Sequence, residues 1–192
     1  AKNGEAITSG ARGKADRETG IDNTLDTRFR IGSMNKMFTA VATLQLVDRG
    51  KLSLDDTIGK ILPGYPNANV ASKVKVRHLL SHTGGTGDIF GPEFEAHRPE
   101  LKTLQDYVKL YGERDLRFEP GSKWEYSNYG FLLLGVLIEK VSGKSYYDFV
   151  AENIYKVAGM TDSGSEPESV KVAGRSKGYM RDRFEMVSNE PT

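Results

Sequence analysis

The sequence predicts an α+β fold, in which a mainly helical middle is flanked by strand-like and loop-like ends. Residues 33–49 have the apolar periodicity of a long helix that Gly50 ends. Residues 129–143 predict a second helix that is apolar on nearly every side and is therefore buried. Both ends of the chain instead show short alternating or loop-like segments, so we expect helices and strands to be segregated along the chain.

At the front, Asn3-Gly4 is a strong signal for a two-residue hairpin turn, and residues 5–15 then alternate loosely like a strand. Residues 16–27 are predicted to form a loop. Only two residues precede the turn, so we expect the chain to be cut at its front, with the entering strand missing. We assign residues 1–32 to the first strands of a sheet domain.

The middle of the chain, residues 33–165, is expected to form the helical domain, and residues 166–192 to begin the return to the sheet. Besides the two long helices, we expect further helices in residues 52–62, 75–85, 101–111 and 145–160.

Composition excludes several classes of protein. The chain of 192 residues carries 27 basic and 26 acidic side chains, interspersed, so no nucleic-acid surface is expected. The absence of cysteine excludes disulfides, thiolate metal sites and cysteine nucleophiles. No apolar run approaches the roughly 18 residues of a membrane span, and the first residues do not resemble a signal segment.

Ser33 and Lys36 are the first candidate pair for catalysis. Residues spaced i and i+3 share one face of a helix, so the lysine amine can reach the serine hydroxyl. Lys36 borders the apolar stripe of its helix, and desolvation of a lysine favours the neutral amine that can act as a base. A serine at a helix N-terminus can also contribute its backbone N–H to stabilise an oxyanion.

A structural interpretation of the same pair is open. Serine is a favoured N-cap, and a lysine can extend from an apolar stripe to water. The spacing also recurs at Ser72 and Lys75, where no long helix follows. Spacing alone therefore does not decide between catalysis and capping.

Tyr126 and Asn128 form the second candidate pair, in a loop immediately before the buried helix. A tyrosine can carry a proton there, and an asparagine amide can hold both a substrate carbonyl and a lysine. An ordinary turn would use the same residue types. The Tyr-x-Asn pattern also occurs at Tyr65, so this motif is weak by itself.

Taken together, the two pairs resemble the serine β-lactamase and penicillin-binding-protein superfamily, in the branch of class C β-lactamases, DD-peptidases and related esterases. The resemblance covers nearly the whole chain, through the segments "DTRFRIGSMNKMFTA", "LVDRGKLSLDD", "VRHLLSHTGG", "FEPGSKWEYSNYGFLLLG" and "AGMTDS". It implies an α+β fold of the class C β-lactamase/DD-peptidase type. It also implies that Ser33 is the acylated nucleophile, Lys36 its activating partner, Tyr126 a general base and acid, and Asn128 a ligand of substrate and lysine.

The resemblance carries further expectations. It implies a small-molecule or peptide substrate with an amide, lactam or ester carbonyl, no cofactor and no metal, and a periplasmic or secreted protein. The family's third motif, Lys-Thr-Gly or His-x-Gly on a late strand, is not found; the "SHTGG" segment at 81–85 matches it in letters only and is interpreted as structural. We therefore expect a fragment with its helical domain largely present and only part of the antiparallel sheet, whose uncovered edges favour self-association.

Three other interpretations of the sequence are open. The "GRSKG" segment around Ser176 matches the nucleophile elbow of α/β-hydrolases, which needs a strand before it and a helix after it. His78 and His82 are spaced like a metal pair, although helix packing and capping explain them better. A non-catalytic protein that recognises penicillin or serves as a scaffold is the alternative to an enzyme, with this fragment inactive for want of the third motif.

Overall fold

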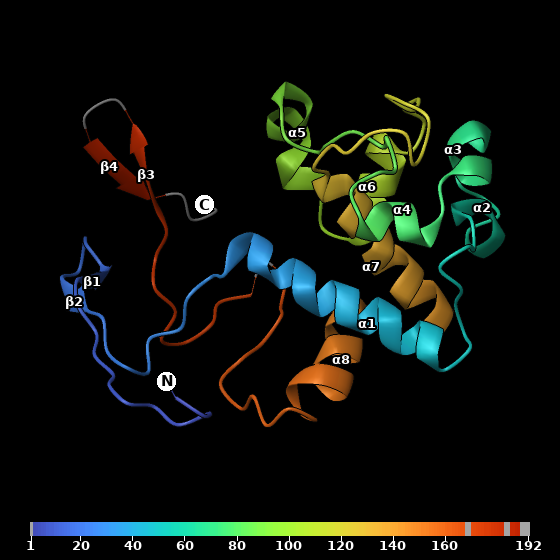
Figure 1. Cartoon of the computed structure of the whole chain (residues 1–192). Coiled ribbons are helices and arrows are strands. Elements are labelled where there is room, and N and C mark those ends of the chain that lie inside the picture. Colours follow the sequence, from blue (N-terminus) through green and yellow to red (C-terminus); the bar gives the residue numbers. More distant parts are fainter. Residues whose placement is uncertain (1, 168–169, 183–184, 189–192) are drawn as a thin grey trace. The chain divides into compact units, whose positions relative to one another are not determined.

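The computed structural model describes residues 2–167, 170–182 and 185–188, and it confirms the α+β prediction (Figure 1). The chain forms two compact units. One contains Ala1–Ser33 with Asp162–Thr192, and the other is Met34–Thr161. Residues 168–169, 183–184 and 189–192 of the expected return to the sheet lie outside the described residues.

The first unit holds two short antiparallel pairs of strands. β1 (Lys14–Asp16) pairs with β2 (Ile21–Asp22), and β3 (Tyr179–Asp182) pairs with β4 (Glu185–Ser188). The early and late segments of this unit are joined by hydrogen bonds, one of them from Lys177 N to the carbonyl oxygen of Ala15 at 2.8 Å.

The Asn3-Gly4 turn is confirmed, because both residues have positive φ angles (51° and 83°) and their neighbours are bridged. The predicted strand over residues 5–15 is wrong for most of its length, since only its last two residues belong to β1. Ile21–Asp22 is a strand within the segment expected to be a loop. Gly10 and Gly13 weaken strand formation in residues 5–15, because a glycine has no side chain to pack. The loose alternation of apolar residues in this segment did not indicate this effect.

The second unit is helical. Its elements are α1 (Lys36–Asp48), α2 (Ile58–Ile61), α3 (Ala68–Lys73), α4 (Val76–Leu80), α5 (Pro92–His97), η2 (Arg98–Glu100), α6 (Leu104–Tyr111), α7 (Asn128–Ser142), α8 (Tyr146–Val150) and the π-helical turn η3 (Ala151–Tyr155). A 3-10 turn, η1 (Gly32–Asn35), leads into α1.

Helix α7 is the centre of the second unit, where it packs against α1, α4, α6 and α8 (Figure 1). The helix is apolar on nearly every side, and it is buried as that pattern predicted. Leu133, Leu134 and Leu137 are completely buried. The helix begins where the Ser127 hydroxyl accepts a hydrogen bond from Gly130 N at 2.8 Å. It ends at Gly143, which adopts the left-handed conformation at φ 69°.

Two short helices were not predicted. α3 starts because the Asn67 side chain accepts hydrogen bonds from Asn69 N and Val70 N. α5 begins with Pro92, a residue type that is favoured at the first position of a helix. The long helix predicted from Ser33 instead begins at Lys36, after η1.

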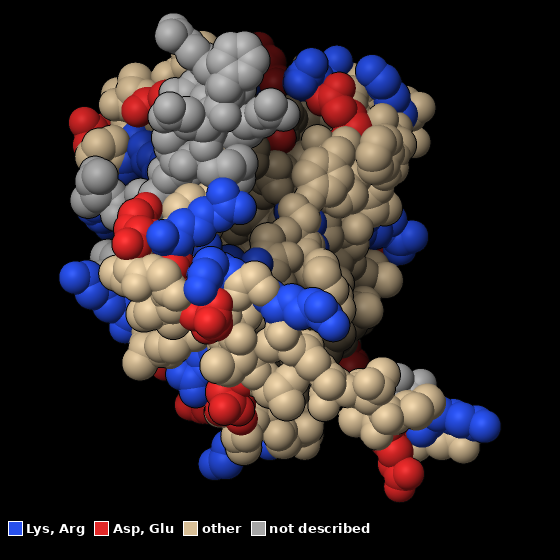
Figure 2. All heavy atoms as spheres, turned by 90° about the vertical axis from the view of Figure 1, so that its left-hand side faces the viewer, with Lys and Arg blue, Asp and Glu red and all other residues tan. Residues whose placement is uncertain are grey.

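Basic and acidic side chains are intermingled on the face shown in Figure 2. Within the described part of the chain, no helix is both long enough and apolar enough to cross a membrane.

We expect the stability of the helical unit to depend on the buried face of α1. Leu46 is 1% exposed whereas Leu44, on the same helix, is 47% exposed. Leu46→Ala should lower the free energy of unfolding by about 2–5 kcal/mol, because it leaves a cavity in a close-packed core. Leu44→Ala, the matched control, should cost less than about 1 kcal/mol. Urea unfolding followed by circular dichroism measures both, and equal losses would contradict the described packing of α1.

Candidate active site

Lys36, Tyr126 and Asn128, predicted from two separate motifs, lie together in the helical unit. Lys36 is the first residue of α1 and Asn128 the first residue of α7. The Lys36 Nζ donates a hydrogen bond to Oδ1 of Asn128 at 2.6 Å. The same Nζ lies over the Tyr126 ring, 4.8 Å from its centroid, and 5.6 Å from the centroid of Phe131.

Ser33 lies in η1, three residues before Lys36. Its side chain is exposed, and the preceding Gly32 has a positive φ of 54°. The serine therefore sits in a tight turn that runs directly into α1, rather than at the first residue of the α-helix as the sequence predicted.

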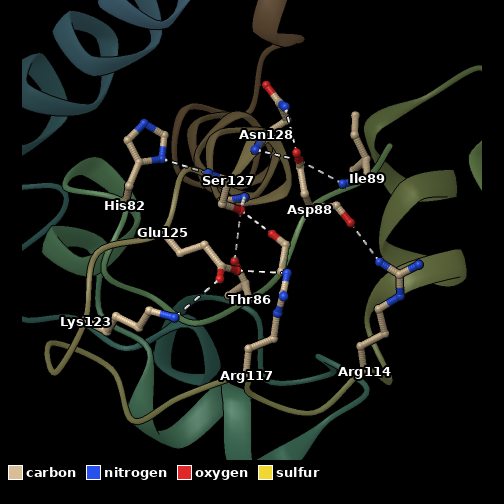
Figure 3. Close-up of polar contacts among 12 residues, drawn as sticks. His82, Thr86, Asp88, Ile89, Arg114, Arg117, Lys123, Glu125, Ser127 and Asn128 are labelled. Atoms are coloured by element: carbon tan, nitrogen blue, oxygen red, sulfur yellow. Dashed lines mark hydrogen bonds and ion pairs between the residues drawn. The ribbon is translucent and has the colours of Figure 1, made fainter. Parts of the chain in front are cut away.

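His82 holds the loop that carries Tyr126. Its Nδ1 accepts a hydrogen bond from Ser127 N at 3.1 Å (Figure 3). Its ring lies 4.5 Å from the ring of Tyr126 and 5.0 Å from that of Phe131, centroid to centroid. His82 also has a positive φ of 58°, which is uncommon for a residue other than glycine. This backbone conformation turns the imidazole toward the start of α7.

Partial burial lowers the pKa of His82, the charge of Lys36 lowers it further, and the carboxylate of Asp88 opposes both effects. A neutral imidazole is the form that can accept the hydrogen bond from Ser127.

Asp88 binds the first residue of α7 (Figure 3). Its Oδ1 accepts hydrogen bonds from Asn128 N at 2.9 Å and from Ile89 N at 2.8 Å. Its Oδ2 accepts from Nδ2 of Asn128 at 3.1 Å. Asp88 was not predicted from the sequence, because no local spacing relates a residue in the 84–88 loop to one that follows it by 40 positions.

Glycines allow this loop to lie close to the segment before α7. Gly85 has φ 68°, and a Cβ built there would come within 2.5 Å of the carbonyl oxygen of Phe118. Arg117 N donates to the Gly85 carbonyl at 2.8 Å, and the Ser127 hydroxyl donates to the carbonyl of Gly87. The loop and the start of α7 are therefore bound together by buried hydrogen bonds.

The second Ser-x-x-Lys pair has ordinary structural roles. The Ser72 hydroxyl donates to the Asn69 carbonyl at 3.1 Å within α3, and Lys75 pairs with Asp55 at 3.1 Å.

Ser176 lies in an irregular segment after the bridge at Arg175, without a strand before it and a helix after it. The elbow interpretation of this serine is therefore wrong.

His78 caps α4, as one of the two weighed interpretations predicted: its Nδ1 accepts a hydrogen bond from Lys75 N at 3.2 Å. The described residues contain no group of three or more histidine, cysteine, aspartate or glutamate side chains that could hold a metal ion.

Comparison with known proteins shows the family to which the chain belongs. The family described as Beta-lactamase matches residues 1–191. Penicillin-binding protein 4* of Bacillus subtilis is 38% identical over 140 residues, which cover 70% of this chain and 30% of that protein. Esterase EstB of Burkholderia gladioli is 32% identical over 188 residues, covering 90% of this chain and 48% of the esterase.

Among solved structures, a penicillin-binding protein from Bacillus halodurans superposes with a TM-score of 0.81 at 34% identity, covering 93% of this chain and 56% of that one. The chain thus spans less than half the length of the two curated relatives. It belongs to the β-lactamase and penicillin-binding-protein family, as the resemblance predicted.

We expect stability to fall on mild acidification because of His78 and His82. Burial is the largest cause of the lowered pKa of each, and neighbouring lysines add to it. A histidine with a lowered pKa binds its proton more readily in the unfolded chain, so the unfolding free energy declines as the pH drops below about 6.5. Urea unfolding between about pH 7.5 and about pH 5.5 measures this decline, in a range above the titration of ordinary carboxylates.

The variants His78→Asn and His82→Asn test the assignment. Asparagine keeps a side-chain acceptor and tolerates a positive φ, but it does not titrate. Each variant should reduce the slope of unfolding free energy against pH, and the double variant should reduce it most. A double variant with the slope of the unmodified chain would show that other groups cause the decline.

Proposed function

We propose that the protein is a serine hydrolase that forms an acyl-enzyme on Ser33. The observation that carries the proposal is the hydrogen bond of 2.6 Å from Lys36 Nζ to Asn128 Oδ1, with the Tyr126 ring beside the same amine. Lys36 thus lies between the amide of Asn128 and the phenol of Tyr126. It also begins α1, directly after the turn that contains Ser33, which suits the activation of that serine.

In the proposed reaction the Ser33 oxygen attacks a carbonyl carbon, and its proton passes to the Tyr126 oxygen, which the Lys36 ammonium stabilises. The bond from that carbon to the leaving nitrogen or oxygen breaks, and the leaving group takes up the proton. A water molecule then adds to the acyl-enzyme, which yields the free acid and restores the Ser33 hydroxyl.

Tyr126 is the proposed proton carrier. Its side chain is 38% exposed, so a substrate can reach it. Its ring is held by the His82 ring on which it stacks and by the adjacent Lys36 Nζ. A cation beside the phenol stabilises negative charge that develops on an oxygen during proton transfer.

The proposed substrates carry an amide, lactam or ester carbonyl. Relatives named as a penicillin-binding protein and as an esterase support this range, and they do not distinguish among its members. We further propose that the "GDIFGPEFEAH" segment, residues 87–97, shapes the entrance to the site, since it contains Asp88, which binds Asn128, and ends with α5.

Ser33→Ala should abolish covalent labelling of the full-length gene product by a penicillin or by an activated short-chain ester. Intact-protein mass spectrometry followed by peptide mapping detects the adduct and its position. The matched control is Ser72→Ala, which removes the serine of the second Ser-x-x-Lys pair and should leave labelling unchanged. Labelling that persists in Ser33→Ala would contradict the assignment of Ser33 as the acylated nucleophile.

The unmodified protein distinguishes an enzyme from a non-catalytic relative. An adduct on Ser33 that forms and then decays with release of product indicates turnover. An adduct that persists indicates recognition without hydrolysis, and a protein that neither forms an adduct nor consumes either reagent would contradict the proposed function.

Tyr126→Phe should slow acylation by about 10²- to 10⁴-fold, the usual contribution of a positioned proton carrier. Tyr65→Phe is the matched control, because Tyr65 also stands in a Tyr-x-Asn pattern. Its hydroxyl is instead hydrogen-bonded to that of Tyr129 at 3.0 Å in the core. The control should lower stability and leave the acylation rate unchanged, so equal rates in the two variants would refute the role of Tyr126.

A further inference from the structure

Asp88 engages Asn128 in two separable ways. One carboxylate oxygen accepts the backbone N–H of Asn128 at 2.9 Å, together with the backbone N–H of Ile89 at 2.8 Å. The other oxygen accepts the side-chain amide N–H of Asn128 at 3.1 Å. The first contact stabilises the start of α7, whereas the second acts on the side chain that binds Lys36.

The second contact decides which way the Asn128 amide faces. A carboxylate only accepts hydrogen bonds, and a lysine ammonium only donates them. The amide must therefore turn its nitrogen to Asp88 and its oxygen to Lys36, which is the arrangement that the two hydrogen bonds form. Asp88 and Lys36 favour the same orientation of the amide from opposite ends.

The contact also limits what Asn128 can offer a ligand. Its amide nitrogen carries two N–H bonds, and Asp88 takes one of them. One N–H is then left for a substrate carbonyl, while the amide oxygen is occupied by Lys36.

The backbone at Asp88 and Ile89 is itself held by hydrogen bonds from two side chains near the end of α6. Arg114 donates to the Asp88 carbonyl at 2.8 Å (Figure 3). The Tyr111 hydroxyl donates to the carbonyl of Ile89 at 3.1 Å. The Arg114 guanidinium also packs 4.0 Å from the centroid of the Tyr111 ring. The backbone that follows the Asp88 side chain is thus hydrogen-bonded to Tyr111, the last residue of α6, and to Arg114 just beyond it.

We propose that Asp88 is a positioning residue for acyl transfer: it orients the Asn128 amide so that its oxygen holds Lys36 and a single N–H faces the substrate. The proposal rests on the proposed function of Ser33 and Lys36. It assigns to Asp88 an effect on rate that is distinct from its contribution to the start of α7.

The variant Asp88→Asn separates the two contributions. The N–H groups of Asn128 and Ile89 require an oxygen in front of them, so the new amide keeps its oxygen there and the backbone contact survives. Its nitrogen then faces the nitrogen of the Asn128 amide, and two donors cannot pair. Asn128 must rotate or move away, which takes its oxygen from Lys36.

The reciprocal variant Asn128→Asp places two carboxylates against each other and should also slow the reaction. In the double variant Asp88→Asn with Asn128→Asp, the new amide donates to the new carboxylate, whose other oxygen can again accept from Lys36. The contact to Lys36 is restored, although position 128 no longer carries an N–H for the substrate.

The experiment measures the rate of Ser33 acylation by an activated ester in the full-length protein, with urea unfolding of every variant. Asp88→Asn should acylate about 10- to 100-fold more slowly, as expected when a partner of a reacting group is displaced. Its unfolding free energy should change by less than about 1 kcal/mol, since the backbone contact remains. Each single variant lowers the acylation rate by some factor. The double variant should acylate faster than the product of these two factors predicts.

The positioning role would be overturned if Asp88→Asn were acylated at the rate of the unmodified protein. It would also be overturned if the double variant were no faster than the product of the two single-variant factors predicts. The failure of the proposed function has a different signature, since the unmodified protein itself would then leave Ser33 unlabelled. A purely structural role for Asp88 would lower stability in proportion to rate, and the reciprocal change at Asn128 would not compensate for it.

Discussion

The hydrogen bond between Lys36 and Asn128 joins the first residues of α1 and α7, and the geometry of the site depends on it. Each residue of an α-helix is rotated by about 100° from the one before, so the starting residue of α7 decides which side chain faces Lys36. That start is set by the Ser127 hydroxyl, which accepts from Gly130 N and donates to the Gly87 carbonyl. The hydrogen bond that caps α7 therefore determines that the Asn128 side chain faces Lys36.

Buried polar groups around this cap are paired, which makes the loop before α7 rigid. Thr86 and Ser127 are both buried, and their hydroxyl oxygens lie 3.3 Å apart. Leaving such a group without a partner costs about 1–3 kcal/mol, so the loop cannot shift without breaking several bonds at once. His82 contributes to the same network through Ser127 N.

Much of the helical unit was predictable because it depends on local patterns. The apolar residues of α7 predicted its burial. The meeting of Lys36, Tyr126 and Asn128 was instead predicted from the resemblance to a known family, because no local pattern joins residues so far apart in sequence. α3 and α5 were missed because their starts depend on a side-chain cap and a proline rather than on apolar periodicity. Asp88 and the stacking of His82 could not be predicted, because both act across the fold on a segment distant in sequence.

The pairing of the loop before α7 also determines where that loop can change length. Residues 122–124 are exposed to solvent, and exposed surface connections of this kind tolerate insertions. Glu125 N and Ser127 N are instead bonded to the backbone oxygen and the ring of His82. One residue added between them would break one of these hydrogen bonds, or would enter the helix and turn Asn128 by about a quarter of a turn around the axis of α7. Variation in loop length can therefore diversify the surroundings of the site, while the last residues before the helix keep a constant spacing.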